Sequence, residues 1–126
     1  MTEAEALRLS DYLEHILEAV RRINQYTADL TEVFFLENQL IQDAVIRNFE
    51  VIGEASRNID RRYPDFLVKH SEVPWISAYE MRNALSHGYF KVDLGIVWQT
   101  IQKHLPEFSQ QVELLKGSDE VRNAGT

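Results

Sequence analysis

The sequence predicts an all-α protein, an up-and-down four-helix bundle with an additional short helix, and three observations support this prediction. Apolar residues recur three or four positions apart through several long segments, as on one face of an α-helix. No segment alternates apolar and polar residues between turns, as a half-buried strand would. The chain has 126 residues and no internal repeat, which fits one domain with a single core.

The first half of the chain contains two of the predicted helices. The first spans about residues 7–26, and Thr2 followed by Glu5 has the spacing of a capping box that could start it. The apolar piece at 33–36 is too short to assign. Asn38 is a plausible N-cap for a second helix over 39–61, in which Gly53 is expected to allow the close approach of another helix.

The second half is punctuated by prolines and glycines. Pro64 is expected to end the second helix, with a connection over 65–72, and Pro74 suits the first turn of a third helix that ends before Gly88. Asp93 is a natural N-cap for a last helix over 94–115, which Pro106 should kink or break. We therefore expect a helical domain over 1–116 and a flexible tail over 117–126, which has almost nothing to bury.

Composition excludes several classes of protein. The absence of cysteine excludes a disulfide scaffold, a thiolate zinc site and a cysteine nucleophile. No apolar run is long enough to span a bilayer and the N-terminus does not resemble a signal peptide, so the sequence predicts a cytoplasmic protein with no membrane contact. The four histidines are not at metal-ligand spacing, and no metal or other cofactor is expected.

Charge is distributed unevenly along the chain. The net charge of −7 argues against nonspecific attraction to nucleic acid. Residues 1–46 carry a balance of −6, whereas residues 47–91 carry +1. An anionic ligand would therefore meet the middle of the chain, although chance clustering on a solvated surface explains the same pattern.

The most reactive combination lies at the end of the predicted third helix. Arg82 and His87 are five residues apart, about 140° around an ideal helix, and Asn83 lies one turn before His87. Because the helix is expected to end at Gly88, both side chains could reach one phosphate placed over that end. A histidine can exchange a proton at neutral pH and an arginine can hold a phosphate, but both also serve as ordinary cations at a helix C-terminus.

Three ordered blocks resemble the HEPN superfamily. Arg82-x4-His87-x-Tyr89 is similar to its signature motif, and RNALSHGYF at 82–90 resembles the form typical of HepT-like toxins. VIRNFEVIGEASRNI at 45–59 and PWISAYEMRN at 74–83 resemble the same family in the same order, followed by the Trp98-containing last helix. The resemblance covers most of the chain.

The resemblance implies a metal-independent endoribonuclease toxin of a type VII toxin–antitoxin system. Such proteins are helical bundles that form homodimers, in which two motif copies face each other across a cleft. By this resemblance His87 would assist attack of a ribose 2′-OH on the adjacent phosphate, and Arg82 would bind and polarise that phosphate. Asn83 would orient His87 or contact the RNA backbone. The substrate would be an RNA, such as tRNA or mRNA, and the product would carry a 2′,3′-cyclic phosphate.

The resemblance also implies a protein partner. HepT-like toxins are typically paired with a minimal nucleotidyltransferase antitoxin, which transfers AMP to the motif tyrosine, here Tyr89. A bulky anion two residues from His87 would repel an RNA phosphate. Without the resemblance, Tyr89 is simply an aromatic residue packed beside Phe90.

The remaining candidates depend on charge or on the resemblance. Glu54 matches the family's GEA block and would support the site or merely solvate the second helix, and Arg47 and Arg57 are candidate RNA contacts on charge grounds. Trp75 and Trp98 lie on apolar stripes and are expected in the core. The alternative function is a non-catalytic module that binds a nucleotide or docks a nucleotidyltransferase.

Overall fold

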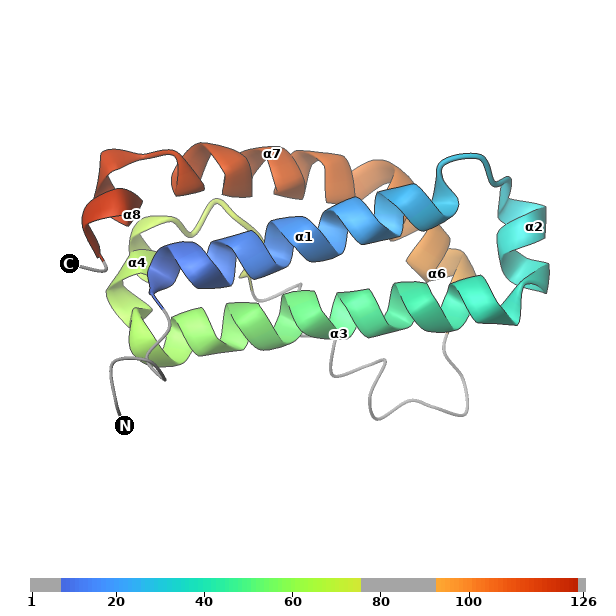
Figure 1. Ribbon diagram of the computed structural model, residues 1–126, viewed down its shortest axis with the longest axis horizontal. Helices are drawn as coiled ribbons and strands as arrows, with labels where there is room; N and C mark the ends of the chain where they lie inside the picture. The colour runs from blue at the N-terminus through green and yellow to red at the C-terminus, as the bar shows by residue number, and fades with distance from the viewer. Residues whose placement is uncertain (1–7, 76–92, 125–126) are drawn as a thin grey trace.

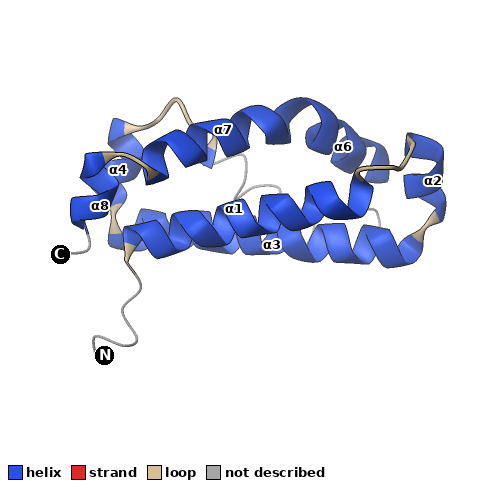
Figure 2. Ribbon diagram, turned by 45° about the horizontal axis from the view of Figure 1, so that its top comes forward, coloured by secondary structure: helices blue, strands red, loops and turns tan. Residues whose placement is uncertain are grey.

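A computed structural model describes residues 8–75 and 93–124 of the chain, and within these ranges every regular element is a helix (Figures 1 and 2). The all-α prediction is confirmed. The third predicted helix falls on residues 76–92 from Ile76 onward, and this part of the chain lies outside the described residues. Among the described helices, none is long and apolar enough to cross a membrane.

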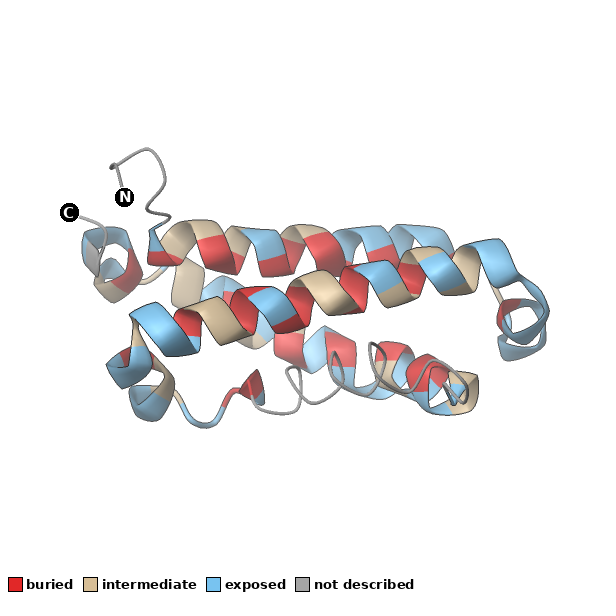
Figure 3. Cartoon of the chain, turned by 90° about the horizontal axis from the view of Figure 1, so that it is seen from below, coloured by how far each residue is buried: buried red, intermediate tan, exposed pale blue. Residues whose placement is uncertain are grey.

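Helix α1 (Leu9–Thr27) lies along both α3 (Gln39–Arg62) and α7 (Leu105–Lys116) (Figure 1). Leu13, Ile16 and Ile23 on α1 have no exposed surface, so its apolar stripe is covered along nearly its whole length. The buried faces of the helices turn toward one another in Figure 3. Trp75 and Trp98 belong to this core, as predicted.

The start of α1 differs from the capping box expected at Thr2 and Glu5. The helix begins at Leu9, and the Asp11 carboxylate accepts the backbone N–H of Arg8 at 2.9 Å. A polar side chain three residues into the helix satisfies one of the free N–H groups of the first turn, which is why the start can fall here. Thr2 and Glu5 lie outside the described residues.

The unassigned apolar piece forms a short helix, α2 (Glu32–Glu37), and the next helix starts where predicted. The Thr31 hydroxyl caps α2 by accepting the N–H of Phe34 at 3.3 Å. The Asn38 side chain then caps α3 by accepting the N–H of Ile41 at 3.0 Å, which confirms Asn38 as the N-cap. Gly53 is buried on α3, while the helix expected to approach it closely stays a prediction.

The expectation of a connection after Pro64 is wrong. Residues Pro64–Lys69 form helix α4, with the proline in its first turn, where the missing N–H needs no partner. Phe66 is buried by this turn of helix. Helix α3 ends just before Pro64, as predicted, but Pro64 also begins the next helix. Burial of Phe66 stabilises that helix.

The predicted last helix is interrupted near Pro106, as expected. Asp93 accepts the N–H of Ile96 at 3.1 Å, which confirms it as the N-cap of α6 (Leu94–Gln99). A π-helical turn, η2 (Thr100–His104), follows, and the N–H of Leu105 bonds to the carbonyl of Thr100, five residues earlier. Because Pro106 offers no N–H, the wider turn accommodates it before α7 begins.

The chain after Gly117 differs from the flexible tail that we expected over 117–126. Residues Asp119–Ala124 form helix α8, which contacts α1 and α7. Val121 is fully covered, and the Ser118 hydroxyl accepts its N–H at 3.3 Å. One buried valine and one capping serine hold this segment against the bundle, and neither is a strong signal in the sequence alone.

An ion cluster ties the end of α7 to α1. The ammonium group of Lys116 and the guanidinium of Arg21 both contact the Glu14 carboxylate. These two cations, Lys116 first, hold the pKa of Glu14 below its usual value. The cluster joins the first half of α1 to the last turn of α7.

The two adjacent phenylalanines of α2 offer a direct test of the core. Phe35 has no exposed surface, whereas Phe34 is 63% exposed. Phe35→Ala should lower the free energy of unfolding by about 3–5 kcal/mol, because a buried ring is replaced by a cavity. Phe34→Ala should change it by less than about 0.5 kcal/mol. Urea denaturation of both variants measures the difference, and equal losses would contradict the placement of Phe35 in the core.

Candidate functional site

The motif residues lie in residues 76–92, which we call the motif segment, and the structure describes the chain on both sides of it. Arg82, Asn83, His87 and Tyr89 all lie in 76–92, outside the described residues. The chain is described up to Trp75 and again from Asp93. The geometry therefore defines the two ends of the motif segment and the surfaces next to them.

Trp75 anchors the entry to the motif segment. Its side chain is almost completely buried, and its indole Nε1 donates a hydrogen bond to the backbone carbonyl of His70 at 3.0 Å. Its ring packs edge-on against Phe108 of α7 and tilted against Phe66 of α4, each at 6.2 Å between centroids. The residue that immediately precedes the motif segment is thus held by two helices and one hydrogen bond.

The exit from the motif segment is anchored by α6. Asp93 caps this helix through its side chain, and Trp98 packs on the buried Phe35 of α2 with the ring centroids 5.3 Å apart. Val97 is also fully covered. The residues that flank the motif segment on both sides therefore belong to the same core.

A cleft of about 600 Å³ lies beside the entry anchor. Its described lining comes from α3, from α4 and from the connection that follows α4: Ser56, Arg57, Asp60, Arg61, Leu67, Val68, Ser71, Val73, Pro74 and Trp75. The volume is in the range of small-molecule sites, and the lining combines apolar side chains with two guanidinium groups. Such a cleft can accept a flat apolar group that carries a negative charge.

Only one of the two arginines that charge alone suggested as RNA contacts lies at the cleft. Arg57 and Arg61 both line the cleft. Arg47 is ten residues earlier on α3, about 15 Å away along the helix axis and about 80° around it, and it pairs with Glu50 at 3.7 Å. Glu54 is exposed at a position between the two arginines along the helix. The structure therefore places Arg57, but not Arg47, at the cleft.

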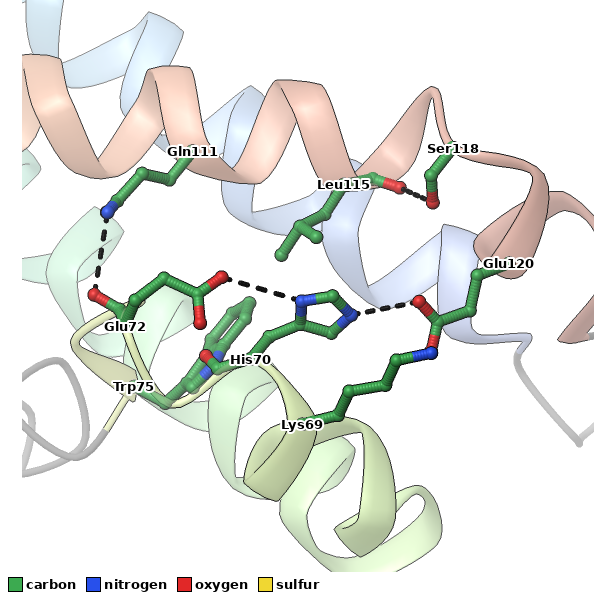
Figure 4. A network of polar contacts seen from close by, with 8 residues as sticks. All are labelled: Lys69, His70, Glu72, Trp75, Gln111, Leu115, Ser118 and Glu120. Atoms are coloured by element: carbon green, nitrogen blue, oxygen red, sulfur yellow. Dashed lines mark hydrogen bonds and ion pairs between the residues drawn. The ribbon is translucent and has the colours of Figure 1, made fainter.

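Sequence reasoning missed a polar contact between His70 and Glu120, which lies next to Trp75 (Figure 4). The His70 ring lies between two carboxylates, with Nε2 at 2.9 Å from Glu120 of α8 and Nδ1 at 3.5 Å from Glu72. Lys69 reaches the same Glu120 at 3.3 Å. The hydrogen bond from His70, and then that from Lys69, holds the pKa of Glu120 below its usual value.

The contact links α8 to the motif segment. The His70 ring hydrogen-bonds to the Glu120 carboxylate, and the His70 carbonyl accepts a hydrogen bond from the Trp75 indole. One residue therefore joins the last helix to Trp75. His70 and Glu120 are 50 residues apart, and no local pattern in the sequence could pair them. Across the two described ranges, no group of three histidine or acidic residues is placed to hold a metal ion.

The fold defines a small helical-bundle protein in which buried residues flank the Arg-x4-His-x-Tyr segment on both sides. The family model described as "Ribonuclease HepT-like" matches residues 16–115, which span both anchors and the motif. The chain belongs to this HepT-like family of the HEPN superfamily.

Curated relatives support the same assignment. The chain is 41% identical over 106 residues to a Thermococcus cleftensis protein named "Probable ribonuclease HepT", a match that covers 84% of this chain and 94% of the relative. It is 39% identical over 113 residues to a Methanocaldococcus jannaschii protein named "Gamma-glutamylcyclotransferase and putative RNase". That match covers 89% of this chain but 50% of the relative, so the chain spans about half of its length. No solved structure matches the chain.

The contact between His70 and Glu120 should make stability depend on acid pH. The lowered pKa means that the folded state favours the Glu120 carboxylate, so its contribution is present above the usual pKa of 4.5 and is lost as the pH falls through the folded-state value. Glu120→Gln should therefore lower Tm by about 2–4 °C at pH 7, with the difference shrinking below pH 4.

Thermal unfolding of wild type and variant across this pH range measures the effect. Glu113→Gln, which removes an exposed carboxylate from α7, is the matched control and should leave Tm unchanged. A Glu120→Gln curve that runs parallel to wild type at every pH would show that the carboxylate contributes nothing through its charge.

Proposed function

We propose that this protein is a metal-independent endoribonuclease that acts in the cytoplasm on RNA such as tRNA or mRNA. The observation that carries the proposal is the Arg82-x4-His87-x-Tyr89 motif in a chain that the HepT-like family model matches over residues 16–115. A relative named "Probable ribonuclease HepT" is similar over nearly its whole length. The motif supplies the two groups that this chemistry needs.

The proposed reaction is a transesterification within the RNA backbone. His87 accepts the proton of the ribose 2′-OH while the 2′ oxygen attacks the adjacent phosphorus. The bond from phosphorus to the 5′ oxygen breaks, and the departing 5′ oxygen takes up a proton. Arg82 binds the phosphate and stabilises its developing charge, and Asn83 orients His87. The products are a 2′,3′-cyclic phosphate and a free 5′-hydroxyl.

The cleft beside Trp75 supports RNA as the substrate. Apolar side chains suit a nucleobase, and the guanidinium groups of Arg57 and Arg61 suit its phosphate. The cleft adjoins the entry to the motif segment, so a nucleotide bound there lies next to Trp75, the last described residue before that segment. A homodimer would place two such sites together and concentrate positive charge on an otherwise acidic protein.

Regulation by modification completes the proposal. A minimal nucleotidyltransferase antitoxin would transfer AMP to the hydroxyl of Tyr89, as part of a type VII toxin–antitoxin pair. The added phosphate would sit two residues from His87, where it repels the RNA phosphate and blocks the motif. Modified protein would then be inactive, and unmodified protein would be toxic.

RNA cleavage in EDTA tests the ribonuclease proposal directly. Intact mass first establishes that the purified protein carries no nucleotide on Tyr89. Wild type should then cleave RNA and leave cyclic phosphate ends, and His87→Ala should be slower by about 10²–10⁴-fold because it lacks the proton acceptor. His104→Ala, which removes an exposed histidine from η2, is the matched control and should retain wild-type activity.

The other outcomes discriminate between functions. Equal cleavage by wild type and His87→Ala would place the activity elsewhere or in a contaminant. No cleavage by unmodified wild type, combined with tight binding of a nucleotide in the cleft, would favour the non-catalytic nucleotide-binding module.

A further inference from the structure

The cleft beside Trp75 contains one group that a simple phosphate site does not need, the carboxylate of Asp60. Arg57, Asp60 and Arg61 all line the cleft from α3. Asp60 and Arg61 follow Arg57 by three and four positions, so the three residues lie within about 100° of one another around the helix. One face of α3 therefore presents two cationic groups and one anionic group to a molecule in the cleft.

Folding alone does not account for the position of Asp60. The residue is exposed and lies two positions before the end of α3, where the helix dipole disfavours a negative charge. Within the described ranges, residues 8–75 and 93–124, no side chain forms an ion pair or a hydrogen bond with the Asp60 carboxylate. Glu50 on the same helix, in contrast, pairs with Arg47 at 3.7 Å. The Asp60 carboxylate therefore keeps its capacity to accept hydrogen bonds from a ligand.

The rest of the described lining is mainly apolar. Leu67 and Val68 belong to α4, and Val73 and Pro74 belong to the connection that follows it. Val68 is 77% exposed, so it offers the cleft an apolar surface that the fold itself does not cover. A planar ring can lie against such side chains while its polar edge reaches the charged groups of α3. This arrangement suits a nucleobase whose edge is recognised by hydrogen bonds.

The four RNA bases differ in what they offer to a carboxylate, which can only accept hydrogen bonds. Guanine carries two adjacent donors, N1–H and the 2-amino group, and the two oxygens of one carboxylate can accept both side by side. Adenine and cytosine each place an amino group next to an unprotonated ring nitrogen, whose lone pair would face the second carboxylate oxygen. Uracil offers one N–H between two carbonyl groups. A carboxylate in a largely apolar cleft therefore favours guanine over the other three bases.

We propose that the cleft is a guanine-recognition site for the RNA of the proposed function, on which this inference rests. Asp60 accepts hydrogen bonds from N1–H and from the 2-amino group of the base, and the apolar side chains of the cleft cover its ring. Arg57 and Arg61 bind the phosphate and contribute affinity that does not depend on the base. Asp60 is thus a specificity-determining residue, because it decides which nucleotide the cleft holds.

NMR titration with the four nucleoside 5′-monophosphates tests the site without requiring catalysis and also measures weak binding. Wild type should bind GMP at least tenfold more tightly than AMP, CMP or UMP. Asp60→Ala should weaken GMP binding at least tenfold and change AMP binding by less than about threefold, because only guanine loses two hydrogen bonds. Asp43→Ala changes another exposed aspartate of α3, about 25 Å away along the helix axis. It is the matched control and should bind GMP within twofold of wild type. Alanine is a good helix former, so both variants should fold.

Inosine 5′-monophosphate (IMP) changes the same contact from the side of the ligand. Its base keeps the N1–H of guanine but lacks the 2-amino group. Wild type should bind GMP several-fold more tightly than IMP, whereas Asp60→Ala should bind the two nucleotides equally. The loss of this difference in the variant pairs the 2-amino group with the Asp60 carboxylate, which a general loss of affinity would not do.

The other outcomes separate this inference from the proposed function. Equal affinity of wild type for the four monophosphates, or no binding of any of them, would overturn the inference. If such a protein still cleaves RNA in EDTA, the ribonuclease proposal stands and the cleft does not select a base. A GMP preference that persists in Asp60→Ala would also overturn the inference, because other residues would then recognise the base. A GMP preference that depends on Asp60, in a protein that cleaves no RNA, would support the guanine site and count against the ribonuclease proposal.

Discussion

The burial of the apolar stripe of α1 against α3 and α7 is the interaction on which the rest of the structure depends. Its leucine and isoleucine side chains reach complete burial along the helix, and α3 and α7 supply the opposing surface. Removing these side chains from water provides the main favourable free energy of a domain of this size. α2, α4, α6 and α8 are short helices that persist because they pack on this frame.

The frame extends to the candidate site through two tryptophans. Trp75 fixes the entry of the motif segment to α4 and α7, and Trp98 fixes the exit helix to α2. Catalysis by a histidine and an arginine on one phosphate requires both side chains to be held in place, and misplacement by about 1 Å can cost about 10²-fold in rate. Under the proposed function, residues buried in the core at both ends would therefore contribute to catalysis by holding the ends of the motif segment.

The sequence predicted the features that depend on local chemistry. The long amphipathic stripes, the Asn38 and Asp93 caps and the interruption near Pro106 follow from spacing and from one or two side chains. The short helices α2, α4 and α8 could not be predicted in this way, because one buried residue stabilises each through contacts with distant segments. The contact between His70 and Glu120 and the cleft that Arg57 lines also depend on three-dimensional packing. For the motif, family resemblance was required, since an arginine and a histidine near a helix end also act as simple capping cations.

The most direct test of this arrangement is a steady-state measurement of RNA cleavage by Trp75→Phe. The variant keeps an aromatic ring between Phe66 and Phe108 but loses the indole N–H that bonds to the His70 carbonyl. If the anchor positions the motif, kcat should fall about tenfold while KM stays within twofold, at a temperature where both proteins are folded. An unchanged kcat in a folded variant would contradict the role of Trp75 in positioning the motif segment.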